Sequence, residues 1–164
     1  SLFQDRLWIY TTYLYALLVL AALGDAADPR IHRRASEVTK HLDDRILVGG
    51  GHLPGSSTDY RTVLFARAMG ADLIVNATDY GGVFDKDPRF HPEAKQYSQI
   101  TYGRLEKIIL SRFEQSPGNY GLFDLKATKL ARRLGIPIVF IDGTDPEEIF
   151  RAVQFCYNGT LVQG

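Results

Sequence analysis

Cysteine and net charge are what this sequence has least of. A single cysteine, Cys156, stands among 164 residues, so an internal disulfide is excluded and a reducing, cytoplasmic compartment is expected. We expect its thiol to be buried and passive. The 19 basic and 19 acidic side chains cancel, so there is no overall positive field to attract a nucleic-acid partner. With 45% hydrophobic residues, the chain can bury a substantial core, and we expect residues 1–164 to form one domain.

A long membrane-spanning run is also absent from the pattern. The most apolar run, Tyr13–Leu23, falls well short of the roughly 20 residues that a membrane-spanning helix needs. No basic run precedes it, and Asp5 and Arg6 lie near its start, which disfavours a secretion signal. We therefore expect a buried amphipathic helix over residues 5–23, closed by Gly24, and no membrane partner.

Short apolar runs alternate with helical patterns along the rest of the chain. Strands are expected at residues 46–49, 72–78, 136–143 and 159–163. Helices are expected at residues 32–42, 60–70, 101–113, 122–135 and 146–154. A strand that is apolar throughout must be covered on both faces, so the pattern predicts the α/β class, as a three-layer α/β/α sandwich with a mainly parallel sheet.

The segment "GGGHLPGSSTDY" follows the first expected strand, and it is rich in glycine and hydroxyl side chains. In open α/β sheets, ligands bind where strands end and helices begin, because helix N-termini carry unpaired amides and a partial positive charge. Glycines let a backbone approach a ligand, and the hydroxyls of Ser56, Ser57 and Thr58 suit phosphate oxygens. The segment predicts an anion site. A long turn that ends in a serine or threonine helix cap is the alternative, and neither the Walker A nor the dinucleotide motif is present.

A second loop, "ATDYGGVFDKDP", follows the second expected strand. Its acids, which include Asp79 and Asp87, suit Mg²⁺ or a ribose hydroxyl, and Phe84 could lie against a base. A solvated acidic turn is the alternative. Two polar loops at one edge of a sheet indicate two neighbouring subsites, as phosphoryl transfer between two nucleotides would need.

The run "GGGHLPGSSTDYRTVLFARAMGADLIVNATDYGGVFDKDP" resembles archaeal-type uridylate kinases of the amino-acid kinase superfamily. The later "YGLFDLKATKLARRLGIPIVFIDGTDPEEIFRAV" and "GTLV" resemble the same enzymes in the same order. The likeness spans residues 5–162. It implies the transfer of the γ-phosphate of ATP to UMP with Mg²⁺ in pyrimidine biosynthesis, by a homo-oligomer that is a hexamer in relatives.

The resemblance also implies two sets of binding residues. The residues expected to bind UMP are Asp5, His52, Leu53, Pro54, Gly55, Ser56, Ser57 and Thr58. The residues expected to bind ATP are Thr78, Asp79, Phe84 and Asp87. No residue is assigned as a metal ligand. Asp79 replaces an amide of the family pattern, and Phe84 lacks a hydroxyl that the pattern has at that position.

The first helix departs further from the family pattern. Trp8, Tyr13 and Tyr15 stand where relatives have a glycine, an arginine and an asparagine, at a subunit contact near the substrate. These aromatics could also simply fill a core or an interface.

The resemblance implies an N-terminal strand with a catalytic lysine and a glycine loop that this sequence does not contain, so we expect the domain to be truncated there. Phosphoryl transfer needs positive charge at the transition state, and no catalytic residue is assigned. The candidate substitutes, each of which could be an ordinary solvated charge, are Arg61, Lys86, Lys126 and Lys129. A catalytically inactive binding or assembly homologue, or a kinase for another small acceptor, are the alternatives.

Overall fold

The computed structural model describes residues 2–38, 44–51, 56–113 and 122–164, with only the backbone described at 2–5 and 112–113. The described chain divides into two compact units, Ser1–Gly70 and Ala71–Gly164. Each unit is described by itself below. That residues 1–164 form a single domain stays a prediction.

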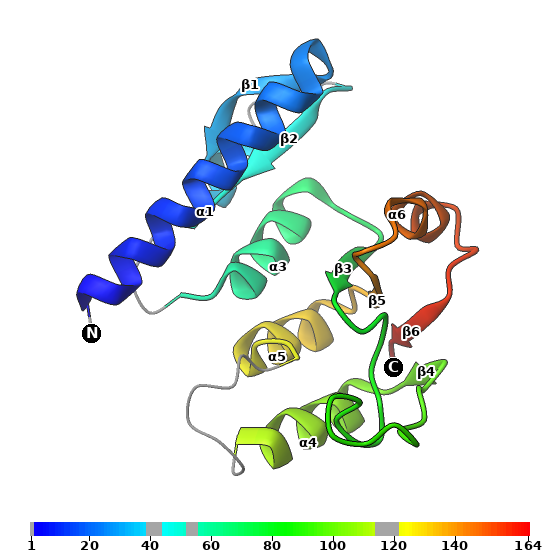
Figure 1. The fold of residues 1–164 in the computed structure, drawn as a ribbon. Helices are drawn as coiled ribbons and strands as arrows, with labels where there is room; N and C mark the ends of the chain where they lie inside the picture. Colours follow the sequence, from blue (N-terminus) through cyan, green and yellow to red (C-terminus); the bar gives the residue numbers. More distant parts are fainter. Residues whose placement is uncertain (1, 39–43, 52–55, 114–121) are drawn as a thin grey trace. The chain divides into compact units, whose positions relative to one another are not determined.

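The first unit pairs two parallel strands with helices. Its elements are α1 (Leu2–Leu23), the 3₁₀ turn η1 (Gly24–Ala26), β1 (Ala27–His32), α2 (Ala35–Val38), β2 (Ile46–Gly49) and α3 (Thr58–Met69). Strands β1 and β2 run parallel, with Ala27 opposite Ile46 and His32 opposite Gly49, so both strands end at the same edge (Figure 1).

Strand β1 corrects the expected helix over residues 32–42, of which only the single turn α2 is described. The interior-facing positions of β1 include Asp28 and His32, while Pro29 and Arg30 face outward. Because polar side chains occupy buried positions, the strand has no apolar alternation that a sequence pattern could reveal.

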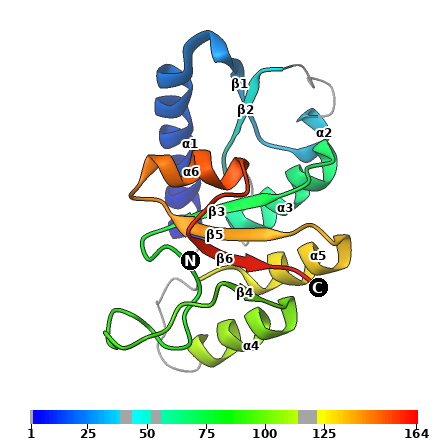
Figure 2. The ribbon, with the colours of Figure 1, turned by 90° about the vertical axis from the view of Figure 1, so that its right-hand side faces the viewer.

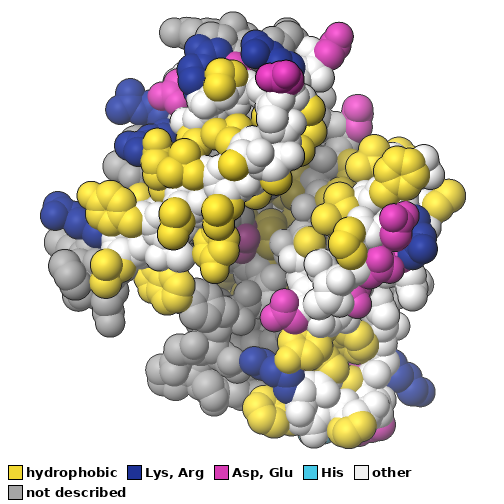
Figure 3. Space-filling view, turned by 45° about the horizontal axis from the view of Figure 1, so that its top comes forward, with side chains coloured by type: hydrophobic (Ala, Val, Ile, Leu, Met, Phe, Trp, Pro, Cys, Tyr) yellow, Lys and Arg dark blue, Asp and Glu magenta, His cyan; other side chains and the backbone are white. Residues whose placement is uncertain are grey.

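Helix α1 forms where expected, but it is neither buried nor amphipathic. Only 6% of its apolar window, Arg6–Ala26, is buried, and Trp8, Leu14 and Tyr15 are each more than half exposed. Figure 3 shows hydrophobic side chains over this part of the surface. The window of 21 residues is also long and apolar enough to cross a membrane, by length and composition alone. The expectation that the apolar run is too short for a membrane-spanning helix is therefore wrong.

Helix α3 has the caps that set its length. Ser57 is its N-cap, and Gly70 ends it in the left-handed conformation at φ 66°. A left-handed C-cap is strained for any residue with a Cβ, which explains the glycine.

The second unit is built on a four-stranded sheet in the order β3-β5-β6-β4 (Figure 2). Its elements are β3 (Ile74–Thr78), β4 (Gln99–Ile100), α4 (Tyr102–Phe113), α5 (Leu125–Leu134), β5 (Ile138–Asp142), α6 (Pro146–Val153) and β6 (Gly159–Val162). Pairs β3–β5 and β4–β6 are parallel and β5–β6 is antiparallel. Helices α4 and α5 lie on one side of the sheet and α6 on the other (Figure 1), so the unit confirms the α/β class with a mainly parallel sheet.

Strand β5 is the centre of this unit's core. Residues Ile138–Ile141 are fully buried, as their unbroken apolar run predicts. Phe140 meets Phe123 edge to face at 5.7 Å between ring centroids, which fixes the start of α5 against the sheet. Cys156, in contrast, is exposed, so the expected buried thiol is wrong.

Candidate functional site

The first candidate loop leaves β2 at Gly49 and enters α3 at Thr58. Its predicted ligand-binding residues His52, Leu53, Pro54 and Gly55 lie outside the described residues, as does the side chain of Asp5. Gly51 is described, and its N–H donates to Thr12 Oγ1 of α1 over 3.0 Å. A Cβ at Gly51 would lie 2.8 Å from that oxygen, so this glycine permits close packing of the loop on α1.

Ser57 caps α3 with two hydrogen bonds. Its Oγ accepts a hydrogen bond from Tyr60 N at 3.1 Å, and its carbonyl accepts from Arg61 N at 3.2 Å. A hydroxyl that accepts one hydrogen bond still has its own proton to donate. The serine cap and the phosphate-binding donor, which the sequence presents as alternatives, are therefore compatible at this residue.

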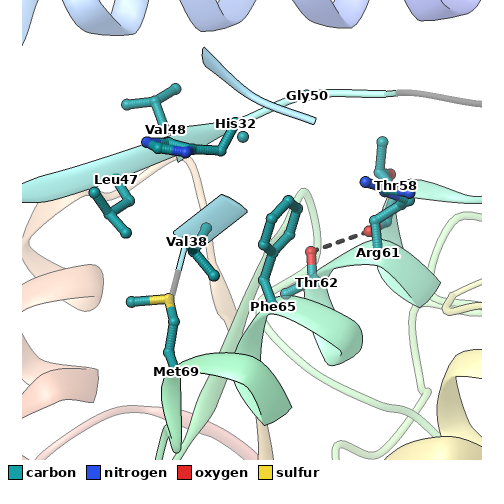
Figure 4. Close-up of a pocket in the computed structure, with 11 residues that line it drawn as sticks. His32, Val38, Leu47, Val48, Gly50, Thr58, Arg61, Thr62, Phe65 and Met69 are labelled. Carbon is teal, nitrogen blue, oxygen red and sulfur yellow. Dashed lines mark hydrogen bonds between the residues drawn. The ribbon is translucent and has the colours of Figure 1, made fainter. Parts of the chain in front are cut away.

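A pocket of about 240 Å³ lies at the carboxyl ends of β1 and β2. Its wall includes His32 at the end of β1, Gly49 and Gly50 at the end of β2, and Thr58 and Arg61 in the first turn of α3. Figure 4 draws Thr58 and Arg61 at one end of the lining and Met69 at the other. The pocket therefore combines a strand edge with a helix N-terminus, the setting in which α/β proteins bind anions.

Arg61 is the unusual side chain of this pocket. It is 8% exposed, and among the described residues its Nε and Nη2 have no hydrogen-bond partner. Its guanidinium lies 5.5 Å from the centre of the Phe65 ring. Burial lowers the pKa of Arg61, against a smaller opposing effect of the Glu37 charge. The interpretation of Arg61 as a solvated surface charge is wrong.

Asp28 is the second buried charge of this unit, and it is fully paired. Arg30 Nη2 lies 2.6 Å from its Oδ2, Arg45 Nη2 lies 3.8 Å from the same oxygen, and His32 Nε2 lies 3.7 Å from Oδ1. The hydrogen bonds from Arg30 hold the pKa of Asp28 well below its usual range. The Asp28 carboxylate thus lies beside His32 of the pocket wall, an arrangement that the sequence did not indicate.

The second candidate loop leaves β3 at Thr78, in the second unit. Thr78 accepts a backbone hydrogen bond from Gly143 N at 2.8 Å, and its Oγ1 lies 3.4 Å from the Ile141 carbonyl. The loop itself is held by the Gln96 side chain on the Gly81 carbonyl and by Val83 N on Thr160 Oγ1. Asp79 is exposed beside Thr78 at the carboxyl end of β3.

The other two residues predicted to bind ATP, Phe84 and Asp87, lie further along the loop and have contacts within it. Phe84 is half-buried and forms an isolated backbone bridge with Gln96. Asp87 is bonded through both oxygens to the Arg89 guanidinium, with 2.6 Å between Oδ2 and Nη2. The structure therefore gives Asp87 a partner within the loop.

The end of β5 adds polar residues that the sequence analysis did not single out. Asp142, which pairs in register with Thr78, accepts hydrogen bonds on Oδ1 from Thr144 N and Oγ1, at 2.8 and 2.6 Å. These bonds lower the pKa of Asp142. Gly143 lies so close to Ala77 that a Cβ would be 3.0 Å from the Ala77 Cβ. The sequence could have indicated these residues, because "DGTD" follows an apolar strand, as the other two candidate loops do.

The other candidate cations are surface charges. Lys86 pairs with Glu93 at 3.1 Å, with both side chains more than half exposed. Lys126 and Lys129 are exposed on α5. Arg61 differs from all three in being buried.

Comparison with known proteins gives consistent matches. The model of the amino acid kinase family matches residues 8–142. The uridylate kinase of Methanoregula boonei is 37% identical over 147 residues, which are 89% of this chain and 62% of the relative. The uridylate kinase of Methanoculleus marisnigri is 36% identical over 160 residues, which are 96% of this chain and 68% of the relative. The chain thus spans about two thirds of the length of these relatives.

Solved structures agree with these sequence matches. The crystal structure of uridylate kinase from Archaeoglobus fulgidus matches 98% of this chain and 72% of its own, with a TM-score of 0.81 and 31% identity. UMP kinase from Bacillus anthracis, 24% identical with a TM-score of 0.76, has the same fold.

Proposed function

This chain belongs to the amino acid kinase family, and we propose that it functions as a uridylate kinase, which transfers the γ-phosphate of ATP to UMP to give UDP. The observation that carries the proposal is its similarity to uridylate kinases over 96% of its length, in sequence and with the candidate loops at the ends of strands. A fold alone would not specify the acceptor.

The UMP subsite is proposed at the start of α3. Ser57 can donate its hydroxyl proton to a phosphate oxygen while it caps the helix, and the helix N-terminus favours a bound anion. Ser56 and Thr58 flank it, and Thr58 lines the pocket. The roles of Asp5 and of residues 52–55 in this subsite remain predictions from the resemblance.

The ATP subsite is proposed at the carboxyl ends of β3 and β5. Thr78 and Asp79 stand there beside Asp142, which is held ionised by Thr144 and offers a hard oxygen of the kind that Mg²⁺ prefers. Asp87 fits a metal less well, because it would have to release Arg89 first. Bound Mg²⁺ would neutralise charge on the phosphates during transfer.

The chain's own residues would act by binding and orienting the two nucleotides. Phosphoryl transfer depends on in-line placement of acceptor and donor, with cations near the transferring group. Among the described residues we assign no catalytic cation. Two alternatives to a uridylate kinase therefore remain from the sequence analysis. They are a binding or assembly homologue without catalysis, and a kinase for another acceptor.

We propose a cytoplasmic homo-oligomer. The support is helix α1, whose outward side chains Leu14, Tyr15 and Leu18 are each more than half exposed. A helix that is apolar all round is normally covered. Sedimentation of the full chain tests this, and a monomer that binds lipid vesicles would contradict it.

The activity is tested by incubating the full chain with ATP, Mg²⁺ and UMP and measuring ADP and UDP formation. CMP, AMP and acceptor-free reactions are the controls. Formation of UDP selectively from UMP supports the proposal. UMP binding without turnover favours the binding homologue, and turnover of a different acceptor would contradict the assignment of UMP.

A further inference from the structure

We infer that Arg61 binds the phosphate group of the acceptor nucleotide in the pocket between the ends of β1 and β2 and the first turn of α3. The inference rests on the proposed function, since it takes UMP as the acceptor. Neither the sequence motifs nor the family resemblance assigns Arg61 to this role.

The first argument is the state of the guanidinium. Arg61 is buried to more than nine-tenths, yet Nε and Nη2 have no hydrogen-bond partner among the described residues. A buried charge is costly unless it is paired, and a structural arginine normally has a carboxylate across from it. The acid whose charge reaches Arg61 is Glu37, but no ion pair joins the two among the described residues.

Glu37 is also committed elsewhere. Its Oε2 accepts hydrogen bonds from Arg33 N at 2.9 Å and from Arg34 N at 3.2 Å, at the start of α2. These backbone bonds lower the pKa of Glu37. Arg61 therefore keeps N–H groups that can donate to a ligand. A planar guanidinium matches the oxygens of a phosphate.

The second argument is where Arg61 stands. Side chains on an α-helix lean toward its N-terminus, so Arg61 leans toward the turn that holds Ser57 and Thr58. The same pocket is lined by Gly49 and Gly50, at the end of β2 (Figure 4). Its volume of about 240 Å³ is several times the roughly 30 Å³ that one water occupies in the liquid, so a phosphate group fits.

The structural alternative is that Arg61 serves only to pack on Phe65. That contact is real, with 5.5 Å between the guanidinium carbon and the ring centre. It does not, however, provide acceptors for the in-plane N–H groups. Binding and stability measurements separate the two roles, because they predict opposite effects on the ligand-free protein.

The test is calorimetric titration of UMP and of uridine into the full chain and its variants. Arg61→Met should weaken UMP binding by about 10- to 100-fold and leave uridine binding unchanged, because only UMP has the phosphate. Arg61→Lys should recover part of the loss. Arg67→Met, on the exposed last turn of the same helix, is the matched control and should bind UMP like the unaltered chain.

The melting temperature of the ligand-free protein is the second readout. Removing an unpaired buried charge should raise it by about 2–4 °C in Arg61→Met. A lower melting temperature or failure to fold would show a packing role and overturn the inference. UMP binding by Arg61→Met equal to that of the unaltered chain would overturn it as well, while leaving the proposed function intact. Absence of UMP binding by the unaltered chain would contradict the proposed function, and the inference with it.

Discussion

The two candidate sites hold their charged side chains in opposite ways. At the pocket of the first unit, Arg61 is buried, and among the described residues its Nε and Nη2 have no hydrogen-bond partner. In the loop after β3 of the second unit, Asp87 and Lys86 are bonded to Arg89 and Glu93 at the surface. A buried cation whose N–H groups lack acceptors favours an anionic ligand, whereas Asp87 and Lys86 already have oppositely charged partners. The difference supports our proposal that Arg61 binds an anionic group at the pocket of the first unit.

Asp28 provides the reference for a fully paired buried charge. Asp28→Asn would leave Arg30 and Arg45 facing a neutral group, and we expect the melting temperature to fall by about 6–12 °C. Asp87→Asn, which breaks the partly exposed pair with Arg89, is the control and should change the melting temperature by less than about 3 °C. Equal effects of the two substitutions would remove the distinction between the fully buried Asp28 carboxylate and the partly exposed Asp87 carboxylate.

The same carboxylate gives a pH dependence with a definite sign. The pKa of Asp28 is lower in the folded protein than the usual value of about 3.9 in the unfolded chain. The contribution of Asp28 to the free energy of unfolding is therefore complete above the pKa of the unfolded chain, and it is lost as pH falls toward the pKa of the folded protein. Between pH 7 and pH 3, the free energy of unfolding measured with urea should fall less in Asp28→Asn than in the unaltered chain.

The contact between the first loop and α1 is tested by Gly51→Ala. The added Cβ would lie 2.8 Å from Thr12 Oγ1, so we expect a loss of about 1–3 kcal/mol in the free energy of unfolding. Gly103→Ala, at the second residue of α4 where the nearest atom is 3.9 Å away, should instead stabilise by less than about 1 kcal/mol. Denaturant titration measures both. A stabilising Gly51→Ala would show that α1 does not pack on the loop as described.

Thr58→Val tests the hydroxyls at the start of α3. We expect UMP binding to weaken by about 1–3 kcal/mol because a polar group would be left unpaired. Thr11→Val is the matched control, since the Thr11 hydroxyl donates to the Leu7 carbonyl of α1 at 3.0 Å and Thr11 is not among the residues that line the pocket. Unchanged affinity in Thr58→Val, measured by calorimetry, would remove Thr58 from the subsite.

Asp87→Asn should have the smallest effect on binding in this set. Because Arg89 already holds the carboxylate, we expect ATP affinity in the presence of Mg²⁺ to fall by less than about 1 kcal/mol, with UMP affinity unchanged. A larger loss specific to ATP and Mg²⁺ would show that Asp87 leaves Arg89 to bind the nucleotide, and would weaken the contrast between the two loops.

The parts of the fold that the sequence predicted are those in which local signals agree. Strand β5 is apolar throughout, α5 lies between its cap Asp124 and Gly135, and α6 begins at Pro146 after the cap Asp145. Strand β1 was missed because its buried positions hold Asp28 and His32. The exposure of α1 was missed because apolar residues on every side of a helix indicate burial, and a sequence does not show whether its partner lies in the same chain.

The candidate site likewise has parts that the sequence predicted and parts that it did not. Loops after β2 and β3 could be predicted from glycine, hydroxyl and acidic residues behind apolar runs. Arg61 could not be distinguished from surface charges, because its burial depends on how α3 packs in the first unit, where α2 lies against it. The pairing of Asp28 with Arg45 has the same origin.

The most direct test of the account is nuclear magnetic resonance of the ¹⁵N-labelled full chain during titration with UMP. We predict that the amides of Ser56, Ser57 and Thr58 and the Nε–H of Arg61 shift with increasing UMP, while uridine moves the Arg61 signal little. The amides of α4, in the other unit, serve as the reference and should stay in place. Shifts confined to the second unit, or none at all, would contradict the claim that the first unit binds the nucleotide phosphate.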